Sequence, residues 1–304
     1  QLTTFNASWG YDFQWNKKTN TNIIKQLGIR IPNIEYVFFN PTQAFKDSLE
    51  KRPSLKNIFT NGLVSSFLSN YSITHYKNKT TNSLSAGLEF SGLLAGLIPG
   101  SFIKKELFRF IKLDAEYKKN IKISKATSFA MRLFAGFGIP MPVGLTTKDS
   151  SIPFTKAYFA GGPNSMRAWQ VRRLGPGKYL GNLKDNDRFG DVRFEANAEY
   201  RALLKNISGV RLEIGLFTDI GNIWTLKDIP DLPGGQFAKN WNFIAVDAGM
   251  GFRLEFGYFL VRLDGSLNLL DPSPDLEFKD KQNKFGVYSV KDGGRLQLGI
   301  NYPF

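Results

Sequence analysis

The sequence predicts an all-β fold, a transmembrane antiparallel β-barrel. The first observation behind this prediction is the segment Asp191–Leu204, in which apolar and polar residues alternate one by one. Successive side chains of a strand point to opposite faces, so this segment has one apolar face and one charged face. The second observation is that the same alternation recurs along the whole chain. A barrel with lipid outside and water inside is built from strands of this kind.

The third observation is the length of the connections, which alternate strictly between short and long. Short connections are expected near 16–22, 77–82, 120–125, 205–209 and 256–258. Long connections are expected near 39–60, 94–107, 139–190, 221–242 and 268–293. Outer-membrane barrels have short periplasmic turns and long extracellular loops, whereas a soluble β-sandwich has no reason to alternate in this way.

Eleven strands are expected, each justified by its own alternation. In the first, apolar residues recur at every second position from Phe5 to Trp15, and the last ends on Phe304. The strands are expected at about 3–15, 23–38, 61–76, 83–93, 108–119, 126–138, 191–204, 210–224, 244–256, 259–267 and 295–304. A short helix is expected within 42–51. Bacterial single-chain barrels have even strand numbers, so either a strand near 152–160 is overlooked or, as we prefer, further strands precede Gln1.

The two faces of these strands differ in chemistry. The charged residues expected to point inward in the later strands are Glu195, Glu199, Arg211, Glu213, Asp219, Asp247, Arg253, Glu255, Arg262 and Asp264. Outward aromatic residues are candidates for the girdles at the membrane interfaces. These candidates are Trp9, Tyr11, Trp15, Tyr258 and Tyr302, and an ordinary aromatic core is the alternative interpretation.

Composition excludes several other classes. The 304 residues contain no apolar run of about 18, so no transmembrane helix is expected. There is no cysteine and a single histidine, His75, which argues against thiolate metal sites and Ser-His-Asp chemistry. The net charge of +14 is spread singly through strands and turns. A nucleic-acid surface would instead gather its cations on one face, so no nucleic-acid partner is expected.

Two segments carry recognisable motifs. Residues 160–179 read AGGPNSMRAWQVRRLGPGKY, within the longest expected loop, and residues 217–224 read FTDIGNIW. Together they resemble the BamA/TamA family of outer-membrane assembly proteins. In that family a loop before the fifth strand from the end carries an Arg-Gly-aromatic motif, and a following strand ends in an aromatic–Asp–Gly–Asn–aromatic run. The chain departs from the first motif at Ala168, where the family has Gly, which puts the tight-turn geometry in doubt.

The resemblance implies a fold and a site. This chain would be the C-terminal part of a sixteen-stranded barrel, with earlier strands and periplasmic POTRA domains lying outside it. The loop 139–190 would fold from the extracellular side into the lumen. Its motif residues are Gly161, Gly162, Arg167, Ala168 and Trp169. A buried guanidinium needs partners, and the expected docking residues are Glu195, Phe217 and Asp219.

The final strand carries a second set of candidate residues. The resemblance implies that the terminal aromatic residues, Tyr302 and Phe304, form a sorting signal and that the last strand pairs weakly with the first. A glycine inside a strand weakens pairing, so Gly299 is the candidate for a lateral seam. The equal alternative is that Gly299 is a small inward residue that leaves room for the loop.

The resemblance also implies a function in the outer membrane of a Gram-negative bacterium. The protein is expected to insert or translocate other outer-membrane proteins through its lateral seam, without bond chemistry, cofactor or metal. Expected partners are membrane lipid or lipopolysaccharide, client outer-membrane proteins, and periplasmic or lipoprotein accessory subunits. The wording of the loop favours the TamA-like branch of Bacteroidota-type bacteria. The alternatives are a passive, anion-favouring channel, a barrel enzyme that uses His75, and a soluble β-sandwich.

Overall fold

The computed structural model shows one antiparallel sheet of eleven strands in chain order. It describes residues 2–17, 20–50, 58–92, 105–141, 151–181, 188–274 and 294–304. The strands are β1 (Leu2–Lys17), β2 (Asn20–Phe39), β3 (Gly62–Lys77), β4 (Thr80–Ser91), β5 (Phe110–Lys122), β6 (Thr127–Pro140), β7 (Val192–Ile207), β8 (Val210–Trp224), β9 (Ala245–Glu255), β10 (Leu260–Leu270) and β11 (Gly294–Ile300). All eleven expected strands are therefore present.

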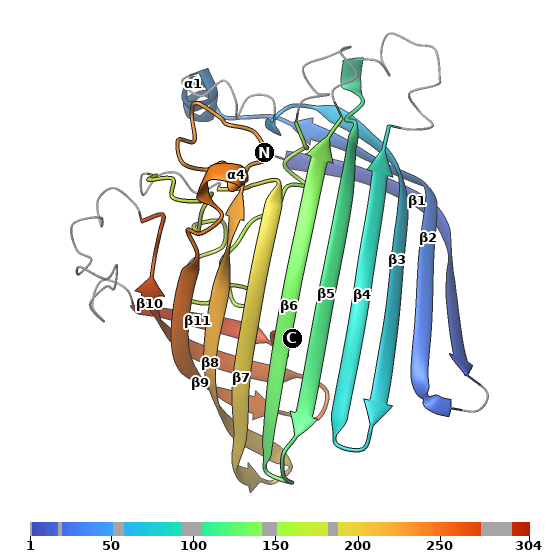
Figure 1. The fold of residues 1–304 in the computed structure, drawn as a ribbon, viewed down its shortest axis with the longest axis vertical. Helices are drawn as coiled ribbons and strands as arrows, with labels where there is room; N and C mark the ends of the chain where they lie inside the picture. Colours follow the sequence, from blue (N-terminus) through green and yellow to red (C-terminus); the bar gives the residue numbers. More distant parts are fainter. Residues whose placement is uncertain are drawn as a thin grey trace.

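The sheet curves but does not close (Figure 1). Every neighbouring pair of strands is antiparallel, from β1–β2 with register pairs such as Leu2–Phe39 to β10–β11 with Leu263–Leu298. Within the described residues, β1 and β11 each pair on one side only. The described residues thus form a partial barrel in which β1 and β11 are the two outermost strands.

The outer and inner faces of the sheet separate apolar from charged residues, as alternation requires. Along β8, Leu216 and Ile220 are exposed on the outer face, while Phe217 and Asp219 are buried on the inner one. The same division runs through β7, β9 and β10. Within the described residues, no helix is long and apolar enough to cross a membrane.

Short turns lie at one end of the sheet and long connections at the other (Figure 1). The short helix expected within 42–51 is α1 (Gln43–Glu50), and a second helix, α4 (Phe237–Asn240), lies in the β8–β9 connection. The segment 152–160 forms turns and isolated bridges but no strand of the sheet. Most of the expected loops 94–107 and 268–293 lies outside the described residues.

The prediction that the last strand continues to Phe304 is wrong. The strand β11 ends at Ile300, because Asn301 adopts a φ of +61°, which breaks the extended backbone. Residues 302–304 consequently leave the sheet, and the C-terminal residue lies halfway along the strands in Figure 1.

Candidate functional site: the loop held inside the barrel

The loop between β6 and β7 occupies the concave side of the sheet. Two consecutive glycines shape its tip, since Gly161 and Gly162 have φ values of +102° and +96°, which other residues rarely adopt. The backbone N–H of Gly162 then donates to the carbonyl of Trp169 at 2.8 Å and closes a compact hairpin. The glycine pair singled out in the sequence therefore has a geometric role, which is to present residues 163–168 to the inner wall.

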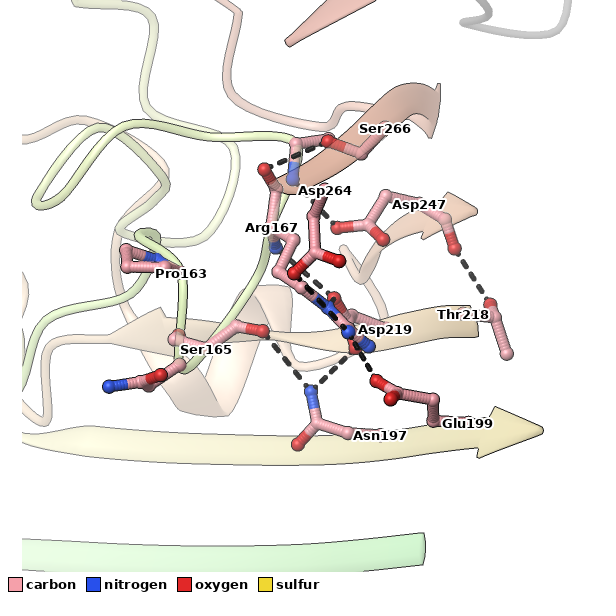
Figure 2. Close-up of polar contacts among 12 residues, drawn as sticks. Pro163, Ser165, Arg167, Asn197, Glu199, Thr218, Asp219, Asp247, Asp264 and Ser266 are labelled. Carbon is pink, nitrogen blue, oxygen red and sulfur yellow. Dashed lines mark hydrogen bonds and ion pairs between the residues drawn. The ribbon is translucent and has the colours of Figure 1, made fainter. Parts of the chain in front are cut away.

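Arg167 projects from this hairpin into a fully buried pocket of acids (Figure 2). Its Nε and Nη2 atoms donate to the two carboxylate oxygens of Asp219 at 2.8 and 2.9 Å. Its Nη1 atom donates to Glu199 at 2.6 Å. The guanidinium carbon lies 3.5 Å from the centre of the Phe217 ring, a close cation–π contact. The structure thus brings together Arg167, Phe217 and Asp219, and adds Glu199, which the sequence analysis did not include among the docking residues.

A second layer of arginines surrounds these acids. Glu199 also contacts Arg201 at 2.8 Å and Arg253 at 3.0 Å. Arg253 reaches Asp264 at 3.0 Å, and Arg262 forms a further close pair with Asp264. Four arginines therefore face four acids when Asp219 and Asp247 are included. This near balance is what allows so many charges to be buried, because an unpaired buried charge is costly.

Ala168 and Trp169 hold the other side of the hairpin. The backbone N–H of Ala168 donates to Asp247 at 3.1 Å, and the Trp169 indole N–H donates to Asp271 at 3.0 Å. Ala168 is not among the residues with positive φ, so this turn does not require glycine there. The doubt raised by Ala168 is therefore removed by the backbone conformation.

Glu195 contacts the loop, but not at Arg167. Its carboxylate accepts from the Ser165 hydroxyl at 2.5 Å and binds Arg132 and Arg193 at 2.9 and 2.8 Å. The alternation correctly places Glu195 on the inner face. It lies four residues nearer the loop end of β7 than Glu199, at the height of Ser165. Periodicity gives the face of the strand on which Glu195 lies. It does not give the loop residue that Glu195 contacts, because this depends on how the loop folds.

The loop has a second anchor on the opposite half of the sheet. The Lys156 ammonium lies 2.9 Å from Glu89 and 3.3 Å from Glu35. The Tyr158 hydroxyl donates to Asp114 at 2.6 Å. Burial lowers the pKa of Lys156, but the two carboxylates raise it more, so the group stays protonated. Sequence analysis missed this anchor, since its signal is only an isolated Lys and Tyr inside a long loop.

The two anchors connect distant strands. Lys156 and Tyr158 bind β2, β4 and β5, whereas residues 165–169 bind β7, β8 and β9. The loop therefore spans the inner face and ties the two halves of the curved sheet together.

The residues after β11 also turn inward, which corrects the prediction for Tyr302. Its hydroxyl donates to Glu213 at 2.7 Å, and its ring lies 4.0 Å from the Arg201 guanidinium carbon. The Phe304 ring lies 5.9 Å from Arg167. Tyr302 is therefore not an outward girdle residue, because the left-handed backbone at Asn301 reverses the expected face. The other girdle candidates, Trp9, Tyr11, Trp15 and Tyr258, are exposed.

Gly299 has a packing role that agrees with the alternative interpretation. It pairs with Arg262 across the β10–β11 ladder, and a Cβ atom at Gly299 would lie 2.6 Å from the Arg262 guanidinium carbon. The Arg262 Nη2 atom donates to the carbonyl of Pro163 at 2.7 Å. Gly299 thus leaves room for an arginine that binds the loop, and its expected role as the weak point of a seam is not needed to explain it.

One further acid lies at the loop end of the sheet, directly before β7. Asp191 accepts a hydrogen bond from the backbone N–H of Leu226 at 2.9 Å. Burial raises the pKa of Asp191 to about 6, although this hydrogen bond and Lys227 act in the opposite direction. Asp191 is thus a candidate for pH-dependent stability.

These observations define the class of protein. An apolar outer wall, a charged inner wall and a loop fixed between them by buried ion pairs are the features of a membrane-spanning β-barrel with an occupied lumen. The described residues contain no group of three or more His, Asp or Glu side chains arranged to hold a metal ion.

The chain belongs to the Omp85 superfamily. A family model of the Omp85 superfamily domain matches residues 1–287. The fold is similar to a crystal structure of BamA from Haemophilus ducreyi lacking POTRA domains 1–3, with a TM-score of 0.57 and 14% sequence identity. The match covers 98% of this chain and 53% of that chain, so this chain spans about half the length of its structural neighbour. A comparison with curated protein sequences finds no match.

Family and fold together confirm the resemblance to BamA/TamA proteins and the prediction of a partial antiparallel barrel. The assignment to a Bacteroidota branch stays a prediction.

Proposed function

We propose that this chain is part of an outer-membrane factor that inserts or translocates other outer-membrane proteins, acting through an open strand edge. The observation that supports the proposal is the edge of the last strand, β11, which within the described residues pairs on one side only, with β10. In lipid, backbone N–H and C=O groups must be hydrogen-bonded. An open edge therefore favours pairing with a strand of a client protein, as in recognition by β-strand addition.

The two outermost strands of the described sheet differ in how far each pairs with its neighbour. The strand β1 pairs with β2 along fifteen positions, whereas β11 pairs with β10 along seven. The outward residues of β11, Leu296, Leu298 and Ile300, are 73%, 67% and 68% exposed. The shorter strand has fewer hydrogen bonds to lose, so β11 is our candidate for the edge that opens or receives a client.

The lumen loop supports this function by bracing the wall next to that edge. The carbonyl of Arg167 accepts hydrogen bonds from Ser266 of β10 at 2.9 Å and from Gln297 of β11 at 2.6 Å. Because these bonds come from two adjacent strands, the loop keeps β11 beside β10 even though their ladder is short. Release of the loop would remove both hydrogen bonds and let β11 separate from β10 more easily.

The proposal extends to the cellular location of this protein, to its chemistry and to its partners. Family membership supports the outer membrane of a Gram-negative bacterium. Strand templating breaks no covalent bond, so we propose a non-enzymatic role without cofactor. Partners would be client outer-membrane proteins, surrounding lipid and accessory subunits in the periplasm. A passive anion channel has less support, because the inward arginines that would attract anions, such as Arg167 and Arg253, are paired with buried acids.

The test uses the absence of cysteine from this chain. We would place a cysteine at Leu298 of β11 and reconstitute the full chain in phospholipid vesicles. The probe is a small single-chain outer-membrane barrel, unfolded in urea and carrying one cysteine in its terminal strand. We expect a disulfide between the two proteins during insertion, together with faster folding of the probe than in empty vesicles.

Leu263→Cys is the matched control. Leu263 lies on the same outward face and pairs with Leu298 in register, but on β10, whose two edges are both occupied. We expect at least several-fold less disulfide from this position. Equal yields from the two positions would contradict the edge proposal, and high ion conductance without faster folding of the probe would favour the channel.

A further inference from the structure

The outer wall contains an apolar groove that the proposed insertion function does not use. It has a volume of about 480 Å³, within the range of about 300–1,000 Å³ that is usual for ligand sites. The outward side chains that line this exterior groove belong to β4–β8, to α4 and to the residues that follow α4; they are Leu84, Ala115, Tyr117, Leu133, Ala135, Phe194, Ala196, Ile220, Trp224, Phe237, Trp241 and Ile244.

The floor of the exterior groove is formed by small residues on adjacent strands. Ala115 of β5 pairs in register with Ala135 of β6, and Ala196 of β7 pairs with Leu133 of β6. Larger outward side chains border these alanines on the side of the short turns, where Tyr117 and Leu133 pair. The wall is therefore recessed over three strands instead of being uniformly covered by large residues.

An aromatic ledge, formed by Phe194, Trp224 and Phe237, borders the floor at the loop end. The rings of Phe194, Trp224 and Phe237 lie 5.5–5.9 Å from one another. The Trp224 indole N–H donates to the carbonyl of Asn240 at 2.8 Å, so α4 is fixed against the outside of the wall and the polar atom of the indole is satisfied. The ledge thus presents only apolar ring surface to the recess below it.

Trp241 marks the depth of the groove in the membrane. It follows α4 at the loop end of the sheet and is 62% exposed. Tryptophan is enriched where the hydrocarbon meets the headgroups. The recess begins beneath this residue and extends toward the middle of the strands, so it lies in the hydrocarbon half of the leaflet at the loop end.

We propose that the exterior groove binds one acyl chain of lipopolysaccharide in the leaflet at the loop end, which is the extracellular leaflet because the long loops of outer-membrane barrels are extracellular. Its lining is apolar, it faces lipid, and a single chain entering beneath Trp241 would run along the alanine floor. Flat wall surface contacts lipid without selecting it, whereas a recess with a ledge gives an acyl chain contacts on more than one side. This proposal rests on the membrane-spanning fold and the proposed outer-membrane location, and not on the insertion activity.

Photo-crosslinking tests the proposal. We would reconstitute the full chain in phosphatidylethanolamine vesicles that contain a phosphatidylethanolamine with a diazirine on one acyl chain, and map the labelled peptides by mass spectrometry. We expect labelling of the groove to exceed labelling of other outward positions, such as Leu254 and Leu263, by several-fold. We expect added lipopolysaccharide to displace the label from the groove, and persistence of the label in its presence would overturn the assignment of the occupant.

Two variants of β7 sharpen the test. Ala196→Phe fills the floor and should abolish the excess labelling. Ala198→Phe is the matched control, because Ala198 is two residues further on the same strand and face but does not line the groove. Heat-modifiable migration on cold gels checks that both variants fold. Uniform labelling of the wall, an equal loss in both variants, or protection of the groove only by a co-purifying protein would each overturn the proposal.

Discussion

Replacing Arg167 with Met removes the cation that joins the lumen loop to the inner wall. The two acids at this site are affected unequally. Glu199 keeps Arg201 at 2.8 Å and Arg253 at 3.0 Å. Asp219 keeps the amide of Asn197 at 2.9 Å, but within the described residues it has no other ion-pair partner. Asp219 is therefore the carboxylate left buried without a compensating charge.

The expected cost follows from that difference. Breaking a buried ion pair by removing one partner destabilises a protein by about 3–5 kcal/mol. Loss of the contact with the Phe217 ring, 3.5 Å from the guanidinium carbon, adds about 1–2 kcal/mol. We therefore expect the Arg167→Met variant to lose about 4–7 kcal/mol of unfolding free energy, which is a large part of the stability of an ordinary domain.

A double-mutant cycle measures the interaction itself. Urea unfolding in detergent micelles at pH 8, followed by tryptophan fluorescence, would compare Arg167→Met, Asp219→Asn and the double variant. Because the Asp219→Asn change removes the carboxylate charge, the double variant should be more stable than the sum of the two single losses, by a coupling energy of about 2–3 kcal/mol. Additive losses, or a change below about 0.5 kcal/mol in Arg167→Met, would refute the ion-pair reasoning.

Two further predictions concern single positions. The pKa of Asp191 is raised to about 6 from 3.8, so the protonated carboxyl favours the folded state and its contribution is lost as pH rises from about 4 through 6. Urea unfolding should therefore give a free energy of unfolding that is lower at pH 7.5 than at pH 4 by at most about 3 kcal/mol. We expect a smaller difference than this, because Asp191 is only half-buried and water still reaches it. Asp191→Asn should abolish this pH dependence, and an unchanged pH dependence would contradict the assignment. Gly299→Ala should lower the temperature at which heat-modifiable migration on gels is lost, because the added Cβ would lie 2.6 Å from the Arg262 guanidinium carbon. Gly265→Ala is the control, because its Cβ would meet no atom closer than 3.7 Å. Equal temperature shifts in the two variants would contradict the packing explanation.

The strands could be predicted from the sequence because their cause is local. Each strand crosses from lipid to lumen, so period-2 alternation is imposed at every residue, and the order of short and long connections follows from hairpin topology. The inner position of Arg167, Phe217 and Asp219 was accessible in the same way, with the help of the two motifs. The side of the sheet on which Tyr302 lies could not be predicted, because the positive φ of Asn301 reverses the alternation.

The contacts between the loop and the inward-facing acids could not be predicted from the sequence, for a different reason. Alternation states that Glu195 and Glu199 both point inward, but only the path of the loop decides that Ser165 meets the first and Arg167 the second. The second anchor at Lys156 has no periodic signal at all.

By itself, the sequence determined that this protein is a sheet of strands with one apolar and one charged face, joined by alternating short and long connections. The tertiary structure decided which charges neutralise one another, why Gly299 is small, and where the outer wall is recessed. The physical reason is that a strand's face is set by its own backbone, whereas ion pairs and grooves depend on the height of each residue relative to segments that are distant in the chain.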